Sequence, residues 1–303
     1  MKDFLLFSGS SNRPLAREIA TLLDLSLGDV EITRFIDNEC RVYVKEAVAG
    51  KRVFVLQSLS EVADQHLVEL CLLATALKDL KASDVTAVIP WMGYSKQDKA
   101  FRNGEAVSSQ LVAKFIEIAG FNKVVTCELH SENILPYFHI PVVELSTHKL
   151  FIGTLQKKSK ALSVVVSPDK GGMSRSEAFA RAAGMPIVYL SKRRDLDSGE
   201  VTVTGISDTV RGMNCIIFDD IINSGATAIK TSEYLKKHGA GTIFLLATHA
   251  VLAGDAKAKL ASSHIDEIVI TNTINVPKNK KFEKLQSISV ASILADAILQ
   301  VVR

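Results

Sequence analysis

The hydrophobic positions of the chain fall into short apolar runs that alternate with amphipathic stretches. Apolar residues have the spacing of a helix from Pro14 onwards, and Pro14 itself suits the first turn. The long apolar stretch 64–80 predicts a second helix. A further helix should be capped by Ser108 and close at Gly120. Between these helices, runs with the length of buried strands occupy residues 4–8, 53–57, 85–89 and 123–129. Strands and helices in alternation predict a parallel α/β domain.

The same alternation starts again near residues 141–150. It predicts strands at 162–166, 187–190, 215–218, 242–247 and 268–270, and helices ending at Ala183 and spanning 228–238, 255–260 and 291–302. The stretch 201–204 alternates with a period of two and should form a small antiparallel flap. We therefore expect two similar, mainly parallel α/β halves, with no residue-level repeat between them.

The most informative stretch reads CIIFDDIINSGATAIK, from Cys215 to Lys230. An apolar strand should end at two carboxylates, Asp219 and Asp220, and a loop of small residues should then lead into a helix. Backbone N–H groups of such a loop, together with a helix N-terminus, favour a phosphate, while carboxylates can hold sugar hydroxyls or a metal-bound diphosphate. Taken alone, an acidic pair at this place is also compatible with an ordinary strand-to-helix turn.

Composition narrows the class of protein. The 303 residues are 47% hydrophobic and 23% charged, which is typical of a globular α/β protein, and no run has the length of a membrane span. The net charge of +3 is too small to argue for nucleic acid. Four cysteines without CxxC spacing indicate reduced thiols, and the start of the chain shows no secretory h-region, so we expect a cytoplasmic protein.

The stretch around the acidic pair resembles the phosphoribosyl-diphosphate loop of phosphoribosyltransferases and ribose-phosphate diphosphokinases. Asn223 stands where many members carry an acid, and Ala226 stands where many carry glycine. The resemblance implies that Asp219 and Asp220 hold ribose hydroxyls. It also implies that the loop binds the 5-phosphate of ribose 5-phosphate through Asn223, Ser224, Gly225, Ala226 and Thr227.

Two segments in the first half resemble ribose-phosphate diphosphokinases in particular. TRFIDNE at 33–39 resembles R-F-x-D-G-E, a segment that contacts adenine from a neighbouring subunit, which implies ATP binding by Phe35, Asp37 and Glu39. Asn38 replaces glycine and tolerates a positive φ. PWMGYSKQDK at 90–99 resembles P-Y-x-G-Y-[AS]-[RK]-Q-D-[RK], which implies ATP contacts from Lys96, Gln97, Asp98 and Lys99. By themselves, these segments are a polar hairpin and a charged loop.

Two further segments imply a metal site. ELH at 128–130 occupies the family's D-L-H position, where the histidine binds the Mg²⁺ carried with ATP, and Glu128 departs from the usual aspartate. SPDKGG at 167–172 matches S-P-D-x-G-G, in which Asp169 is the second metal residue. The resemblance therefore implies Mg²⁺ as cofactor, held by His130 and Asp169, with few protein ligands because magnesium keeps several waters. A histidine at a strand end is otherwise most often structural.

SKRR at 191–194 matches the start of the family's flexible catalytic loop, which implies that Lys192 and Arg194 cover the transferring diphosphoryl group. The competing interpretation of these cations is a solvated patch. The resemblance covers nearly the whole chain and implies two phosphoribosyltransferase-type domains, each a mainly parallel sheet flanked by helices. We place the ATP side at 1–143, joined by the last helix at 291–303, and the ribose 5-phosphate side at 144–290.

The resemblance implies a kinase-type transferase of nucleotide biosynthesis with ATP and ribose 5-phosphate as substrates. If the segment at 35–39 completes a neighbour's adenine site, the protein is a homo-oligomer, at least a dimer. A phosphoribosyltransferase would share the acidic loop but would not need the two ATP segments. A non-catalytic regulatory subunit of the same fold is the other alternative, against which the presence of His130, Asp169 and Lys192 argues.

Overall fold

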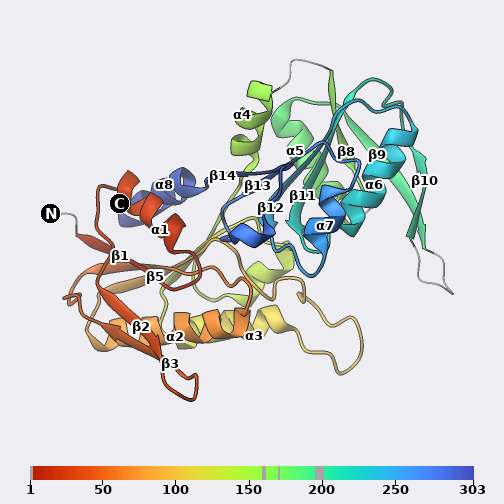
Figure 1. Cartoon of the computed structure of the whole chain (residues 1–303). Coiled ribbons are helices and arrows are strands. Elements are labelled where there is room, and N and C mark those ends of the chain that lie inside the picture. The colour runs from red at the N-terminus through yellow and green to blue at the C-terminus, as the bar shows by residue number, and fades with distance from the viewer. Residues whose placement is uncertain (1–2, 159–161, 170, 195–200) are drawn as a thin grey trace. The chain divides into compact units, whose positions relative to one another are not determined.

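The computed structural model describes residues 3–158, 162–169, 171–194 and 201–303, and these residues form two compact units. Unit 1 consists of Met1–Ser146, Asn272–Asn275 and Ser289–Arg303, whereas unit 2 consists of Thr147–Thr271 and Val276–Ile288. Each unit has its own sheet and core (Figure 1). No described helix has the length and apolar character needed to cross a membrane.

Unit 1 is built on a five-stranded parallel sheet in the order β1-β4-β5-β6-β7, with a separate antiparallel hairpin, β2-β3. Its strands are β1 (Phe4–Ser8), β2 (Val30–Arg34), β3 (Cys40–Val44), β4 (Arg52–Leu56), β5 (Asp84–Ile89), β6 (Lys123–Cys127) and β7 (Val142–Leu145). Its helices are α1 (Arg13–Leu22), α2 (Ala63–Asp79), α3 (Ser108–Ile118), α8 (Ala291–Val302) and the short 3₁₀ helix η1 (Glu132–Tyr137).

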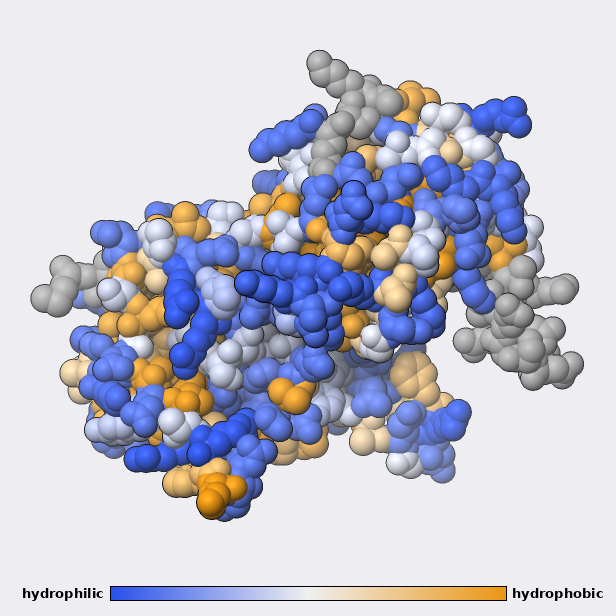
Figure 2. Space-filling model, viewed as in Figure 1, coloured by the Kyte–Doolittle hydropathy of each residue, from blue (hydrophilic) through white to orange (hydrophobic). Residues whose placement is uncertain are grey.

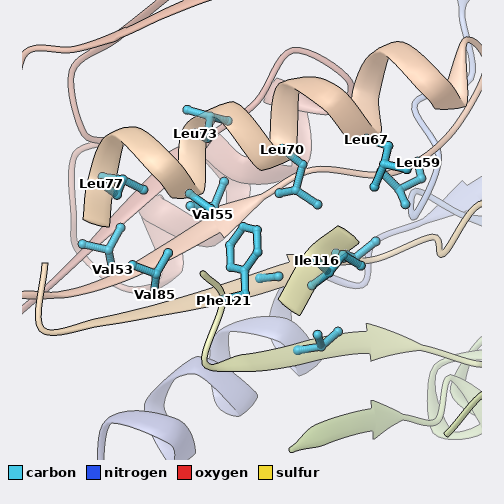
Figure 3. Close-up of a cluster of buried hydrophobic side chains, with 14 of the residues drawn as sticks. Val53, Val55, Leu59, Leu67, Leu70, Leu73, Leu77, Val85, Ile116 and Phe121 are labelled. Atoms are coloured by element: carbon cyan, nitrogen blue, oxygen red, sulfur yellow. The ribbon is translucent and has the colours of Figure 1, made fainter. Parts of the chain in front are cut away.

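The core of unit 1 follows from the alternation of apolar residues on both faces of its strands. Val53 and Val55 of β4 point toward α2, whose leucines at positions 67, 70, 73 and 77 meet them (Figure 3). The intervening Phe54 and Leu56 are also buried. Because the strands are apolar on both faces, helices cover both: α2 and α3 lie on one face, and the neighbouring helices α1 and α8 lie on the other (Figure 1).

Unit 2 contains a seven-stranded sheet in the order β10-β9-β8-β11-β12-β13-β14. Its strands are β8 (Ser163–Ser167), β9 (Ile187–Arg194), β10 (Val201–Ile206), β11 (Asn214–Ile222), β12 (Ile243–Ala250), β13 (Glu267–Thr271) and β14 (Leu285–Ile288). Its helices are α4 (His148–Lys158), α5 (Met173–Ala183), α6 (Ala226–Lys237), α7 (Ala256–Ala261) and the 3₁₀ helix η2 (Lys278–Lys280). The predicted flap is confirmed, because β10 pairs with β9 antiparallel while the remaining pairs are parallel.

The two faces of β11 hold two separate apolar clusters. Ile216 and Phe218 belong to a cluster with residues of α4 and α5, whereas Cys215 and Ile217 belong to a cluster with residues of α6 and α7. The ring of Phe218 stacks on that of Phe179 of α5, with the ring centroids 4.3 Å apart and nearly parallel. This contact fixes the position of α5 along β11, immediately before the acidic pair.

Several predicted boundaries were wrong. The strand expected at 215–218 continues to Ile222, so Asp219 and Asp220 lie inside β11 and not beyond its end. The helix expected from Ala228 begins at Ala226. Ser108 is the first residue of α3 and does not cap it, since Val107 occupies the cap position without a side-chain hydrogen bond. The last helix was predicted within its observed bounds.

Candidate active site

The direction in which unit 2 adds strands reverses at the pair β8-β11. From β8 the chain moves to β9 on one side, and after the flap it returns to β11 on the other side. In open parallel sheets, a crevice forms at the carboxyl ends of the strands at such a reversal, and ligands bind there. The loop after β8 carries Asp169, and the end of β11 carries Asp219 and Asp220. The topology therefore gathers three predicted carboxylates at one edge of one sheet.

The register of the sheet explains how acids inside a strand can still lie at this edge. β8 pairs with β11 only at residues 214–217, while β12 continues to pair as far as Ile222. Residues 218–222 thus extend past the end of β8 on the side where the loop with Asp169 begins. The expected strand end at Phe218 is within one residue of the last pair with β8, at Ile217, but β11 itself continues to Ile222 beside β12.

The loop between β11 and α6 makes a tight turn at Gly225. Gly225 lies in the left-handed region at φ +74°, and a Cβ there would be 2.9 Å from Cδ2 of Leu260, so a side chain would strain the backbone and displace Leu260. The N-cap residue Gly225 offers no side-chain hydrogen bond, the Ser224 hydroxyl accepts a long one from the N–H of Ala226 at 3.5 Å, and Asn223, Ser224, Ala226 and Thr227 are exposed. The N-terminal N–H groups of α6 therefore face a polar, open edge that suits an anion. Ala226 and Thr227 belong to the first turn of the helix.

An arginine that the sequence interpretation did not include lies against the acidic pair. Arg175 of α5 donates a hydrogen bond from Nη1 to Oδ1 of Asp219 at 3.0 Å, and the same Nη1 is 2.9 Å from Oδ1 of Asp220 in an ion pair. The side chain of Asp220 is 1% exposed, and that of Asp219 is 29% exposed. Burial, followed by the adjacent charge of Asp220, raises the pKa of Asp219 to about 7, although Arg175 opposes this shift.

Arg175 could have been found from the sequence. It lies three residues after the Gly171-Gly172 turn and four residues before Phe179, on a helix whose apolar face must pack on the sheet. Residues four apart lie on one face of a helix, so an aromatic residue that packs on β11 places Arg175 against the same strand. The sequence does not show, however, which helix packs on the strand that carries Asp219 and Asp220. The contact of Arg175 with them depends on the position of α5 along β11.

The turn after β8 holds Asp169 in place. Its Oδ1 accepts a hydrogen bond from the N–H of Gly172 at 3.0 Å, and its carbonyl accepts one from the Ser167 hydroxyl at 3.3 Å. Gly172 then caps α5. The carboxylate of Asp169 is thus oriented at the N-terminus of the helix that also carries Arg175. Among the described residues, no three histidines, cysteines or acids converge as a metal cluster.

The predicted catalytic cations lie on the strand that borders the flap. The backbone of Lys192 and Arg194 belongs to β9 and pairs with Val203 and Val201 of β10, respectively. The side chains of both residues lie outside the described part of the chain, and so do residues 195–200. The structure therefore confirms the antiparallel flap and leaves the predicted roles of the two cations untested.

In unit 1, residues 35–39 form the tip of the β2-β3 hairpin. Asn38 has φ +71°, as expected for the replacement of a turn glycine, and Asp37 accepts a hydrogen bond from the N–H of Glu39. Arg34 donates to the Asn38 carbonyl and to Gln65 of α2. Phe35 is 53% exposed and Ile36 is fully exposed. Beside them, a hollow of about 440 Å³ is lined by Arg34, Asn38, Glu39, Cys40, Asp64, Gln65, Val68 and Leu72.

The remaining ATP candidates follow the neighbouring strands β5 and β6 of unit 1. Lys96, Gln97 and Lys99 are exposed, whereas Asp98 is buried and accepts a hydrogen bond from the Asn133 side-chain amide at 3.0 Å. Burial opposes the ionisation of Asp98, but hydrogen bonds from the side chains of Ser131 and Asn133 lower its pKa overall. Asp98 therefore ties its loop to the segment that begins at His130, and His130 itself is partly buried.

Comparisons with known proteins cover both units. Residues 4–120 match the family model described as the N-terminal domain of ribose phosphate pyrophosphokinase, and residues 167–303 match that of the phosphoribosyl synthetase-associated domain. Ribose-phosphate pyrophosphokinases of Ralstonia nicotianae and Thermotoga maritima are 37% and 38% identical to the chain. They cover 100% and 99% of it, with 96% and 95% of their own lengths. A solved phosphoribosylpyrophosphate synthetase from Mycobacterium smegmatis is 33% identical and superimposes with a TM-score of 0.92 over 99% of each chain.

Proposed function

Because the chain belongs to the ribose-phosphate pyrophosphokinase family, we propose that it transfers the β,γ-diphosphoryl group of ATP to ribose 5-phosphate. The products are 5-phosphoribosyl 1-diphosphate and AMP. The observation that supports this assignment most directly is the edge of unit 2, where an acidic pair and an exposed helix N-terminus lie at the strand-order reversal. A sugar phosphate needs both features, one for its hydroxyls and one for its phosphate.

Ribose 5-phosphate binds at this edge. The 5-phosphate accepts hydrogen bonds from backbone N–H groups of the turn at 223–227, where the N-terminal end of the α6 dipole also favours a negative charge. The ribose hydroxyls donate to the carboxylates of Asp219 and Asp220. Together these contacts orient the anomeric hydroxyl, and positioning is one of the two main contributions that a protein makes to a phosphoryl-type transfer, beside stabilisation of charge.

In the transfer, the anomeric oxygen forms a bond to the β-phosphorus of ATP, and the bond from that phosphorus to the α,β-bridging oxygen breaks. AMP leaves with the electron pair, and the hydroxyl proton is lost to solvent. Negative charge increases on the bridging oxygen as the bond breaks. Lys192 and Arg194 of β9 are the cations that we assign to this charge, since β9 pairs with the last residues of β8 and then continues past its carboxyl end to Lys192 and Arg194.

ATP binds through unit 1. Lys96 and Lys99 are exposed cations for its phosphates, Gln97 is an exposed amide for polar contacts, and Asp98 holds their loop beside the His130 segment. Phe35, Asp37 and Glu39 at the hairpin tip contact adenine. Since Phe35 and Ile36 leave apolar surface exposed on a rigid turn, we propose that they meet a second copy of the chain, which makes the protein at least a dimer.

Mg²⁺ is the cofactor that this chemistry requires, and the donor groups fit it. Asp169 offers a carboxylate oriented by its bond to Gly172, the hard oxygen ligand that magnesium prefers, and His130 offers a ring nitrogen. Bound there, the ion supplies neutralisation of phosphate charge. The four free thiols support the cytoplasmic, reducing compartment that we expect.

The test is a nucleotide assay by chromatography on the purified protein. We expect ATP to be consumed only when ribose 5-phosphate and Mg²⁺ are both present, with AMP as the nucleotide product. Formation of ADP would identify an ordinary kinase and contradict the proposal. No turnover with intact substrate binding would support the regulatory-subunit alternative, and consumption of 5-phosphoribosyl 1-diphosphate with a nucleobase would support a phosphoribosyltransferase.

A further inference from the structure

Arg175 is a cation in contact with the acidic pair, Asp219 and Asp220. It differs from Lys192 and Arg194, the two cations that the proposed function already uses. Its Nη1 lies 3.0 Å from Oδ1 of Asp219 and 2.9 Å from Oδ1 of Asp220, so one nitrogen bridges the two carboxylates. Its side chain is only 18% exposed. A guanidinium loses much of its hydration in such a place, and its planar shape restricts the directions from which it can hold two oxygens.

Packing of α5 fixes Arg175 in this position. Phe179, four residues later on the same helix face, stacks on Phe218, the residue that precedes Asp219 on β11. Phe151 and His148 of α4 meet the edge of the same Phe218 ring, at centroid distances of 5.8 and 5.1 Å. The aromatic cluster therefore prevents α5 from sliding along β11, and the bridge to the acidic pair is built into the core of unit 2.

We propose that Arg175 is a positioning residue for ribose 5-phosphate: its guanidinium bridges Asp219 and Asp220, offsets part of their repulsion and favours the ionised form of both as acceptors for the ribose hydroxyls. This inference rests on the proposed function, because it assigns the hydroxyls to the acidic pair. Arg175 acts through the two carboxylates and makes no contact with the reacting atoms.

The electrostatic surroundings of Asp219 support this role. The charge of Asp220 on the same strand raises the pKa of Asp219, and Arg175 on α5 is the cation that lowers it. On the neighbouring strand β12, Ala247 pairs with Asp219 and His249 pairs with Ile221. On the β8 side, the nearest acid in sequence is Asp169, whose carboxylate is bound to the N–H of Gly172. Glu177 of α5 is bound to the hydroxyl of Tyr189.

Removing Arg175 should therefore change the pH dependence of sugar binding. Without the guanidinium, the repulsion between the two carboxylates is no longer offset, and the pKa of Asp219 rises further. The acid limb of kcat/KM for ribose 5-phosphate, which reports the ionisation of the pair in the free enzyme, moves to higher pH. At pH 9, where the pair is ionised in both proteins, the difference between them becomes smaller.

The experiment compares the wild type with Arg175→Met, Arg175→Lys and Arg181→Met over pH 5.5–9.5. For Arg175→Met we expect KM for ribose 5-phosphate to rise about tenfold at pH 7, with a smaller change in kcat and an unchanged KM for ATP. Arg175→Lys keeps the charge, so its acid limb should stay near that of the wild type while its KM rises. Arg181 is an exposed residue in the last turn of the same helix, and its variant should match the wild type.

A loss of activity that is the same at every pH would show a structural role and overturn the proposal. A rise in the KM for ATP equal to that for ribose 5-phosphate would overturn it too, because Arg175 would then serve the diphosphate. If Arg175→Met does not fold, Arg175→Lys still decides, since an unchanged KM for ribose 5-phosphate would contradict a role for the guanidinium geometry.

A titration without substrate separates this inference from the proposed function. In protein labelled with ¹³C at aspartate carboxyl carbons, the Asp219 resonance, assigned with Asp219→Asn, should titrate at higher pH in Arg175→Met than in the wild type. An unchanged titration would overturn the inference even in an active enzyme. If the wild type forms no AMP, the proposed function fails while the titration still shows whether Arg175 controls the acidic pair.

Discussion

The sheet of unit 1 adds its strands in one direction, β1-β4-β5-β6-β7, whereas the sheet of unit 2 reverses direction between β8 and β11. At such a reversal the topology of unit 2 favours a ligand site, and three predicted carboxylates lie there: Asp169 after β8, and Asp219 and Asp220 in the last part of β11. Unit 1 has no such reversal among its described strands. Its candidates occupy a hairpin tip and two loops after neighbouring strands. Under the proposed function, the unit with the reversal carries the sugar-phosphate site, and the unit without it carries the nucleotide site on a hairpin tip and loops.

The two units also shift the pKa of an aspartate in opposite directions. Neutral donors, the side chains of Ser131 and Asn133, surround Asp98 in unit 1 and lower its pKa despite burial. In unit 2, burial and a second carboxylate raise the pKa of Asp219 to about 7. Asp98 is thus ionised at neutral pH and serves to hold two loops together. Asp219 titrates near neutral pH, so a ligand or a neighbouring cation can change its state.

The largest effect should come from the flap of unit 2. Lys192→Ala should lower kcat by about a hundredfold to a thousandfold, or roughly 3–4 kcal/mol, because a preorganised cation is lost where charge develops. Affinities for ATP and ribose 5-phosphate should change little, since an interaction made only in the transition state does not contribute to binding. Steady-state kinetics with separate measurement of ATP binding provide the check. Lys237→Ala, in the exposed last turn of α6, is the control. A kcat near that of the wild type would mean that Lys192 is a solvated surface residue.

A selective effect on the sugar is expected from the acidic pair. Asp220→Asn should weaken ribose 5-phosphate binding by about 1.5–3 kcal/mol, tenfold or more, because a buried charged acceptor is lost. ATP binding should be unchanged if the sugar site is confined to unit 2. Calorimetry with each substrate measures both, and Asp208→Asn, at an exposed turn of the same unit, is the matched control. Equal losses for the two substrates would reassign the pair to the metal.

The converse selectivity is expected at the hairpin of unit 1. Phe35→Ser should raise the KM for ATP by roughly tenfold, since stacking of a base on an aromatic ring contributes about 1–3 kcal/mol. The KM for ribose 5-phosphate should not change. Stability should be little affected because Phe35 is more than half exposed, and Leu22→Ser, at a similarly exposed apolar position on α1, is the control. If ATP binding survives intact, the hairpin does not contribute to the adenine site.

The smallest effect concerns the stability of unit 1. Asn133→Ala removes a donor to Asp98 and should lower the free energy of unfolding by about 1 kcal/mol at pH 7. Because the folded pKa of Asp98 is lowered, this contribution is complete above its unfolded value near 3.8 and is lost as pH falls through the lowered value. Urea unfolding of both proteins at pH 7 and at pH 2.5 measures the difference. A loss of equal size at both pH values would show that Asn133 acts through packing and not through the charge of Asp98.

The sequence by itself determined the class of fold, most elements and the candidate residues. Short apolar runs identify buried strands in either unit, because a parallel strand must be apolar on both faces. The positive φ of Asn38 and the sharp turn at Gly225 were also predictable, since few residues adopt that backbone. Strand order was not predictable in this way, because local patterns do not specify which strands become neighbours.

Tertiary structure alone decided which of these residues act together. Pairing of β11 with β8 stops at Ile217 while pairing with β12 continues to Ile222, which keeps Asp219 and Asp220 inside a strand and yet at the edge of the sheet. The stacking of Phe179 on Phe218 placed Arg175 on that pair across 44 residues of sequence. The pKa of a carboxyl depends on the charges, donors and burial around it, and packing of distant segments supplies all three. For that reason the sequence indicated different binding roles for Asp98 and Asp219 but not the opposite shifts of their pKa values, which follow from the folded chain.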